Sequence, residues 1–145
     1  MLAVASAGCA TSSPVSPAAR ATPVKKPVQA APRVPSARGV LMAYLDATLA
    51  GDHLRAWGYL SADDRDRLPR DAYVRRERAN DRLRAQVRAL GPFRYTLESL
   101  REKGSDATAI VILRSGLGSE RVRFALKREG PRWVVLYASS WSSAE

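Results

Sequence analysis

The C-terminal part of the chain, residues 93–140, alternates between apolar and polar side chains over short segments. Residues 93–98 and 121–127 follow this period of two, which is typical of strands with one buried and one solvated face. Residues 107–113 are apolar at almost every position, which predicts a strand covered on both sides, and residues 133–137 predict a last strand. Short turns rich in Gly, Ser and Pro separate these segments, so the pattern predicts a four-stranded antiparallel meander.

Upstream of the sheet, apolar residues recur at helical spacing. A first helix is expected from a capping Ser36 to about Ala50, with one apolar stripe. Asp52 is expected to cap a second helix and Ser61 a third, and a longer helix is expected over residues 69–90. The predicted fold class is therefore α+β, with N-terminal helices packed on a curved four-stranded antiparallel sheet.

The predicted long helix contains few apolar residues and many arginines, with Glu77 and Asp81 between them. This composition favours a solvated helix with ion pairs along its own surface. The functional alternative is a basic surface that meets anionic lipid, a cell-wall polymer or an acidic partner. Its candidate residues, together with two from the predicted sheet, are Arg75, Arg76, Arg78, Arg82, Arg121 and Arg123.

The 145 residues suit one domain plus an extension, and the net charge of +10 is unevenly distributed. Residues 10–38 hold five basic residues and no acidic one, so half of the excess charge lies in this segment. Six prolines between residues 10 and 35 predict a disordered tether. There is no apolar run of about 18 residues, and no recognised motif accompanies the charge, so neither a membrane-spanning helix nor nucleic-acid binding is favoured.

The single cysteine, Cys9, follows a run of small apolar residues. This segment resembles the end of a bacterial lipoprotein signal peptide, in which the cysteine becomes lipidated. Ala7 and Gly8 fit the pattern, whereas Ser6 stands where a larger aliphatic residue is usual. A positively charged start is missing, and an upstream start codon would supply it. The resemblance predicts lipidation of Cys9 and a place in the bacterial cell envelope; the alternative is a chance cysteine in a disordered N-terminus.

Three further segments carry a family resemblance. They are Leu-Ala-Gly-Asp at 49–52 followed by Ala56 and Trp57, the Gly-Pro turn at 91–92 after the basic helix, and the hairpin at 128–135. The chain thus resembles the nuclear transport factor 2-like (SnoaL-like, cystatin-like) superfamily, and within it small bacterial lipoproteins of unknown function. The resemblance implies a cone-shaped α+β roll with an apolar cavity. Its candidate lining consists of aromatic residues and comprises Tyr44, Trp57, Tyr73, Phe93, Tyr95, Phe124, Trp133 and Tyr137.

The enzymes of that superfamily place an acidic residue inside the cone, often with a histidine or tyrosine. The only histidine here, His53, lies in a predicted turn and is expected to face solvent. Glu98 alternates with apolar neighbours and is expected to point outward. A general base needs an enclosed site, and no acid is predicted to occupy one. The sequence therefore predicts a non-catalytic protein with neither cofactor nor metal.

The resulting hypothesis divides the chain into a signal-peptide end (1–9), a linker (10–35), one α+β domain (36–141) and a tail (142–145). It describes a lipid-anchored binding or scaffolding module of the bacterial envelope. An envelope protein, an anionic polymer and a second copy of the chain are its candidate partners. Two alternatives remain, a carrier of a small apolar ligand in the cone and an isomerase- or dehydratase-like enzyme.

Overall fold

A computed structural model of the chain describes residues 34–140 and 142–143. Cys9 and nearly all of the predicted linker lie outside this part. In the described residues, helices α1 to α4 precede the sheet, and a short 3-10 helix and a two-residue strand follow it. The elements are α1 (Ala37–Ala50), α2 (His53–Gly58), α3 (Ala62–Arg67), α4 (Arg70–Ala89), β1 (Arg94–Lys103), β2 (Asp106–Ser115), β3 (Gly118–Glu129), β4 (Arg132–Val135), η1 (Tyr137–Ser139) and β5 (Ser142–Ser143).

The three predicted helix caps are confirmed. The side-chain oxygens of Ser36, Asp52 and Ser61 accept hydrogen bonds from the backbone N–H groups three residues later, at 3.2, 3.1 and 3.1 Å. These bonds satisfy donors that the first turn of a helix leaves without a partner. Gly51 ends α1 in the left-handed region, with φ of 76°. The sequence therefore predicts correctly the residue at which each of the first three helices begins.

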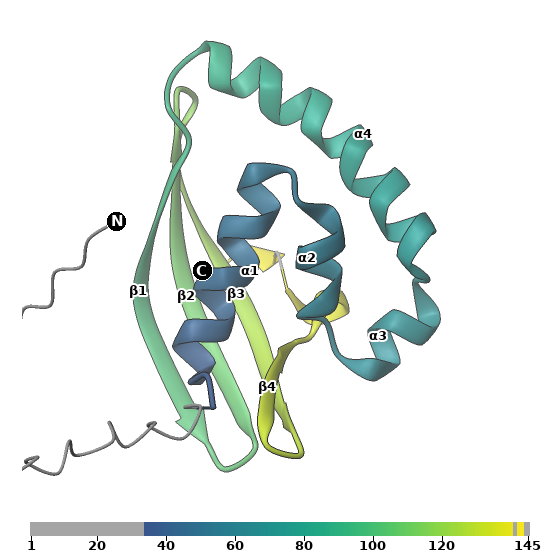
Figure 1. Cartoon of the computed structure of the whole chain (residues 1–145). Helices are drawn as coiled ribbons and strands as arrows, with labels where there is room; N and C mark the ends of the chain where they lie inside the picture. Colours follow the sequence, from purple (N-terminus) through teal and green to yellow (C-terminus); the bar gives the residue numbers. More distant parts are fainter. Residues whose placement is uncertain (1–33, 141, 144–145) are drawn as a thin grey trace, which may run out of the picture. The chain divides into compact units, whose positions relative to one another are not determined.

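Strands β1 to β4 pair in sequence order, each antiparallel to the next, and β5 pairs with β3 beside β4. Figure 1 shows the helices on one side of this open sheet, with α1 along it and α2 between α1 and α4. The predicted α+β class, with helices N-terminal to the sheet, is confirmed. The sheet does not close on itself within the described residues, so it is an open sheet and not a cone.

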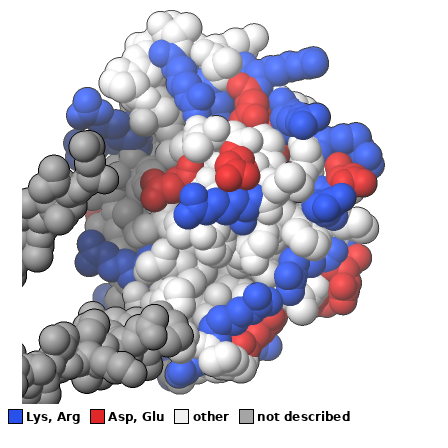
Figure 2. All heavy atoms as spheres, viewed as in Figure 1, with Lys and Arg blue, Asp and Glu red and all other residues white. Residues whose placement is uncertain are grey.

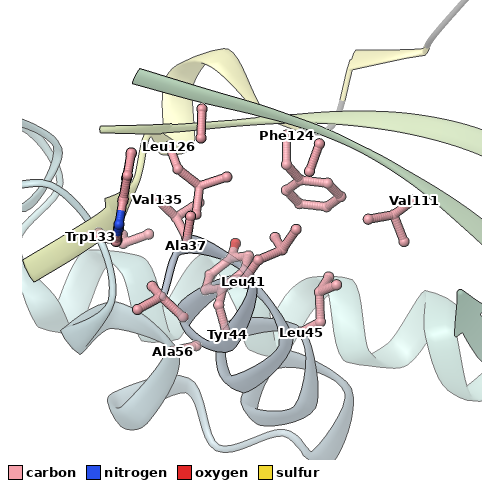
Figure 3. Close-up of a cluster of buried hydrophobic side chains, with 14 of the residues drawn as sticks. Ala37, Leu41, Tyr44, Leu45, Ala56, Val111, Phe124, Leu126, Trp133 and Val135 are labelled. Carbon is pink, nitrogen blue, oxygen red and sulfur yellow. The ribbon is translucent and has the colours of Figure 1, made fainter. Parts of the chain in front are cut away.

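The core lies between α1 and the covered face of the sheet. Leu41, Tyr44 and Leu45 of α1 are buried against sheet residues that include Val111 and Phe124 (Figure 3). The rings of Tyr44 and Phe124 meet edge to face, with centroids 6.4 Å apart. Burial of each such side chain contributes about 1.5–3 kcal/mol. Side chains therefore fill the space in which the sequence resemblance implied a cavity.

Two predictions about the strands are wrong. The predicted double-sided cover of β2 is found on one side only, because Ile110 and Ile112 are half-buried on the face away from the helices. Arg123 and Arg121 lie opposite them on β3, where long aliphatic stems shield part of an apolar neighbour. The last strand ends at Val135, and the chain then turns into η1. Tyr137 consequently leaves the sheet and reaches α4.

Candidate functional site

Helix α4 carries a stripe of mostly charged residues, buried at Tyr73 and Glu77, half-buried at Asp81 and Arg84 and exposed at Arg88. Tyr73, Glu77, Asp81, Arg84 and Arg88 recur at intervals of three or four residues, so they lie along one side of the helix. Tyr73 and Glu77 are fully buried, with the glutamate only 3% exposed. Leu83, in contrast, is 62% exposed. The prediction of a solvated helix is therefore wrong for Glu77, although the predicted ion pairs within α4 do form.

Arg84 is the centre of this arrangement. Its guanidinium donates to Glu77 Oε2 at 2.6 Å and to Asp81 Oδ1 at 2.8 Å. Tyr137 of η1 donates its hydroxyl to Glu77 Oε1 at 2.9 Å, and the Nε2 atom of His53 lies 2.6 Å from Asp81 Oδ2. These five residues form what we call the α4 polar network. It joins α4 to α2 and to the segment that follows the sheet.

The network shifts the pKa values of its members. Burial alone would raise the pKa of the Asp81 carboxyl, but hydrogen bonds from His53 and Arg84 outweigh it, and the pKa is lowered. Ionised Asp81 therefore stabilises the fold at neutral pH, and this contribution is lost as the pH falls through the lowered pKa. Burial, followed by the charge of Glu77, raises the pKa of the Tyr137 phenol. Tyr137 thus remains a hydrogen-bond donor at neutral pH.

The structure corrects the prediction for His53, which is only 5% exposed. It opens α2 directly under α4, and the Asp81 carboxylate meets its ring. A signal for this was present in the sequence. The acidic residues in the middle of α4 share the helical spacing of Tyr73, its one large aromatic residue. This spacing places the acids on the same side of the helix as the tyrosine ring, but the partners that bury this side are distant in the sequence.

Next to the network lies an open groove of about 760 Å³, formed by residues of α3, α4 and the η1 segment. We call it the α3–α4 groove. Glu77, Arg84 and Tyr137 line it together with Leu83. The Arg76 guanidinium lies over the ring of Tyr137, 5.4 Å from its centroid. This volume is within the range of small-molecule sites in proteins.

A second feature is the face of the sheet that points away from the helices, which we call the outer sheet face. Its exposed basic residues, assigned from the strand register and from exposure, are Arg94, Arg101, Lys103, Arg114, Arg121, Arg123 and Lys127. Arg94 and Arg114 are register partners, an arrangement of like charges that costs stability. Glu98 accepts hydrogen bonds from Arg121 at 2.7 and 3.0 Å. Asp106 is exposed on the same face, where it is the register partner of both Lys103 and Lys127. A shallow groove of about 650 Å³ crosses this face.

The predicted basic surface is divided between two sides of the molecule. Arg75, Arg76, Arg78 and Arg82 are exposed on α4, in the helical layer. Arg121 and Arg123 are exposed on the outer sheet face. In Figure 2, acidic side chains lie between the basic ones on the visible side of the molecule. The structure therefore does not bring the six arginines together.

The eight aromatic residues proposed as a cavity lining lie in several places. Tyr44, Phe124 and Trp133 are buried in the core, and Tyr73 is buried beneath α4, where its ring contacts Tyr137 edge to face at 5.5 Å. Tyr137 lines the α3–α4 groove.

The other three proposed lining residues, Trp57, Phe93 and Tyr95, are half-buried. Trp57 donates its Nε1–H to the Leu68 carbonyl at 3.1 Å, and Tyr95 donates its hydroxyl to Asp46. Burial and this bond raise the pKa of Tyr95 to about 12. Trp57 thus joins α2 to the end of α3 and Tyr95 joins β1 to α1, while Phe93 packs against the core, so the three do not converge on one cavity.

Membrane and metal binding concern residues 34–140 and 142–143. Among the helices there, none is both long and apolar enough to cross a bilayer. In the same part of the chain, His, Asp and Glu side chains do not gather in groups of three or more that could hold a metal ion.

Comparison with known proteins finds neither a matching family model nor a matching curated protein sequence. Among solved structures, the fold is similar to that of RPA3114 from Rhodopseudomonas palustris, a SEC-C motif containing protein. The TM-score is 0.51 and the sequence identity 17%, over 74% of this chain and 77% of that protein. At this identity the likeness concerns the fold alone.

The structural comparison overturns the resemblance to the nuclear transport factor 2-like superfamily. The similar structure is a SEC-C motif containing protein, and the sheet of this chain is open. The short segments that carried the resemblance serve local geometry. Gly51 and Asp52 end one helix and cap the next, and Gly130 has a positive φ of 59° in the last hairpin turn. Such residues end helices, cap helices and form turns in α+β folds of many kinds, so they do not define one family.

Proposed function

We propose that the chain is a non-catalytic binding module, held at the bacterial envelope by a lipid on Cys9, which binds an anionic polymer on its outer sheet face. The observation that carries the proposal is the charge of that face. Seven exposed basic side chains lie on three adjacent strands and outnumber the acids among them, namely Glu98, which is paired with Arg121, and Asp106, the register partner of Lys103 and Lys127. An excess of positive charge on one face attracts polyanions and concentrates them locally.

The arrangement of the basic residues favours a polymer that carries repeated negative charges. Side chains two positions apart on a strand point to the same face about 6.6 Å apart, so Arg121 and Arg123 present charges at a regular interval. The opposed pair of Arg94 and Arg114 would also be relieved by an anion between them. An extended polymer meets several of these positions at once.

Two other occupants fit this face less well. β-Sheets twist, so a flat bilayer would contact only part of the face, whereas a flexible polymer can follow it. A second copy of the chain would bring like charges together if the two outer sheet faces met, which disfavours that dimer. A flexible anionic polymer therefore agrees best with both shape and charge.

The hydrogen bonds of Glu77 support a non-catalytic role. Glu77 lines the α3–α4 groove, the kind of place where an acid would favour the enzyme alternative. However, one of its carboxylate oxygens accepts a hydrogen bond from Tyr137 and the other accepts one from Arg84. A base must reach the proton that it abstracts, and these bonds compete with that role. The filled core likewise weighs against a carrier of an apolar ligand between α1 and the sheet.

The polymer proposal is tested by replacing three exposed basic residues, Arg101, Arg123 and Lys127, together by Gln. At about 1 kcal/mol for each charge near a polyanion, we expect roughly 100-fold weaker binding of linear polyphosphate. Fluorescence anisotropy of labelled polyphosphate measures it. The Arg121–Glu98 pair stays intact in this variant.

The matched control removes the same number of charges from α4, by replacing Arg75, Arg78 and Arg82 by Gln. We expect its affinity for polyphosphate to stay within about threefold of the wild type, since steering by net charge alone is weak at 0.15 M salt. Equal losses in the two triple variants would refute the outer sheet face as the site. If the chain bound anionic vesicles or duplex DNA of equal charge more tightly than polyphosphate, the partner of this face would be a membrane or a nucleic acid and not the proposed polymer.

The anchor is tested by metabolic labelling with a fatty acid in a bacterium, with the chain expressed from an upstream start that completes the leader. We expect label on the wild type and none on Cys9→Ser, because the cysteine thiol is the acceptor. Ser6→Leu restores the usual aliphatic residue and should be labelled at least as well as the wild type. Label on Cys9→Ser equal to that of the wild type would exclude the lipid anchor.

A further inference from the structure

The α3–α4 groove combines features that the polymer proposal does not use. Arginines from two helices face into it, Arg67 from α3 and Arg76 and Arg84 from α4. Its apolar surface includes Leu68 and Leu83. Leu83 is 62% exposed on the helix whose opposite side is buried, so a leucine side chain is left open beside a cluster of cations.

The acidic residues of the groove are held by the protein itself. Glu77 accepts bonds from Tyr137 and Arg84, and Asp64 accepts the Tyr137 backbone N–H at 2.8 Å as well as the Ser61 hydroxyl. A guanidinium carries five N–H donors, and the bonds to Glu77 and Asp81 account for two of those of Arg84. The exposed Arg76 is fixed over the Tyr137 ring. The donors that a ligand would meet are therefore mainly those of arginine.

From this arrangement we infer that the α3–α4 groove is a second binding site, which takes a small amphipathic anion. The ligand carries one carboxylate or phosphate ester on an apolar body. Its anionic group is bound by Arg76 at the rim, since the planar guanidinium matches both kinds of oxyanion. Its apolar body lies on Leu68 and Leu83. The volume of about 760 Å³ accommodates such a molecule.

The inference is tested by titrating the ¹⁵N-labelled chain with decanoate and, separately, with decyl phosphate. Decanol and inorganic phosphate serve as the chain-only and the headgroup-only probes. We expect amide shifts in residues 64–68, 76–84 and 137–140 with either amphipathic anion. At the same concentrations we expect at least tenfold weaker binding of decanol and of phosphate. Whichever of decanoate and decyl phosphate binds more tightly identifies the anionic group of the ligand, and tighter binding of either one supports the site.

Three variants locate the binding. Arg76→Gln is expected to weaken decanoate binding about tenfold, as for the loss of one charge-assisted hydrogen bond, and Leu83→Ser should weaken it similarly. Arg82→Gln lies on the exposed side of α4 and should bind decanoate as the wild type does. These side chains are exposed, so circular dichroism should show unchanged folding. Decanoate binding that is unaffected by Arg76→Gln, equal affinity for decanol, or no shifts up to millimolar decanoate would each overturn the inference.

Discussion

Replacing Arg84 by Met is expected to lower the free energy of unfolding by about 3–5 kcal/mol. The substitution keeps most of the aliphatic stem but removes the charge that pairs with Glu77 and Asp81. Glu77 is 3% exposed, so its carboxylate would remain buried without its cation. Urea denaturation at pH 7, followed by circular dichroism, measures the change.

The matched control is Arg82→Met, an exposed position two residues away on the same helix, which should change stability by less than about 0.5 kcal/mol. A double variant, Glu77→Leu with Arg84→Met, removes both charges of the buried pair. Because hydrophobic pairs of similar volume often replace buried ion pairs at little cost, it should recover much of the loss. If Arg84→Met cost no more than Arg82→Met, solvent would have to screen the pair, and the α4 polar network would not hold the helix.

Gly116→Ala is expected to lower the free energy of unfolding by about 2–3 kcal/mol. A Cβ atom at this position would lie 2.2 Å from the backbone oxygen of Leu90, at the end of α4. Gly91, with φ of 155°, also approaches this turn closely, and a Cβ atom added to Gly91 would lie 3.1 Å from the Gly116 Cα. The backbone of the β2–β3 turn would therefore have to move away from α4. Thermal or urea unfolding detects the change.

Gly58→Ala provides the contrast, because a Cβ at that position has open space around it. Gly58 is the last residue of α2, where alanine is favoured over glycine by up to about 1 kcal/mol, so this variant should be as stable as the wild type or more so. Equal stability of Gly116→Ala and Gly58→Ala would show that the close approach of α4 and the β2–β3 turn is not required.

These two variants examine the two ways in which α4 is attached. Along its middle the helix is held by ion pairs and hydrogen bonds to α2 and η1, and at its end by a backbone contact with a turn of the sheet. Its buried surface includes few large apolar side chains, chiefly Tyr73. This explains why the helix has a weak apolar pattern in the sequence and is nevertheless held against the domain.

The outer sheet face illustrates a different limit of the sequence. Alternation along β3 predicted that Arg121, Arg123 and Lys127 lie on a solvated face, and the structure agrees. The adjacent strand contributes Ile110 and Ile112 to the same face. From these apolar residues the sequence pattern predicted that both faces of β2 are covered. An apolar residue on one strand is partly shielded by long basic side chains of the next, and only the strand register shows which residues those are.

The sequence by itself determined the local features: the α+β class, the capping residues Ser36, Asp52 and Ser61, the turns, and the alternation of the strands. These depend on backbone conformation and on neighbours a few residues away. Only the tertiary structure decided which side of α4 is buried, that the sheet is open, and where the grooves lie. The reason is that Glu77 meets Tyr137 sixty positions along the chain and Asp81 meets His53 at a separation of 28. Whether a charged stripe faces water or the protein interior depends on such distant partners, and local periodicity carries no record of them.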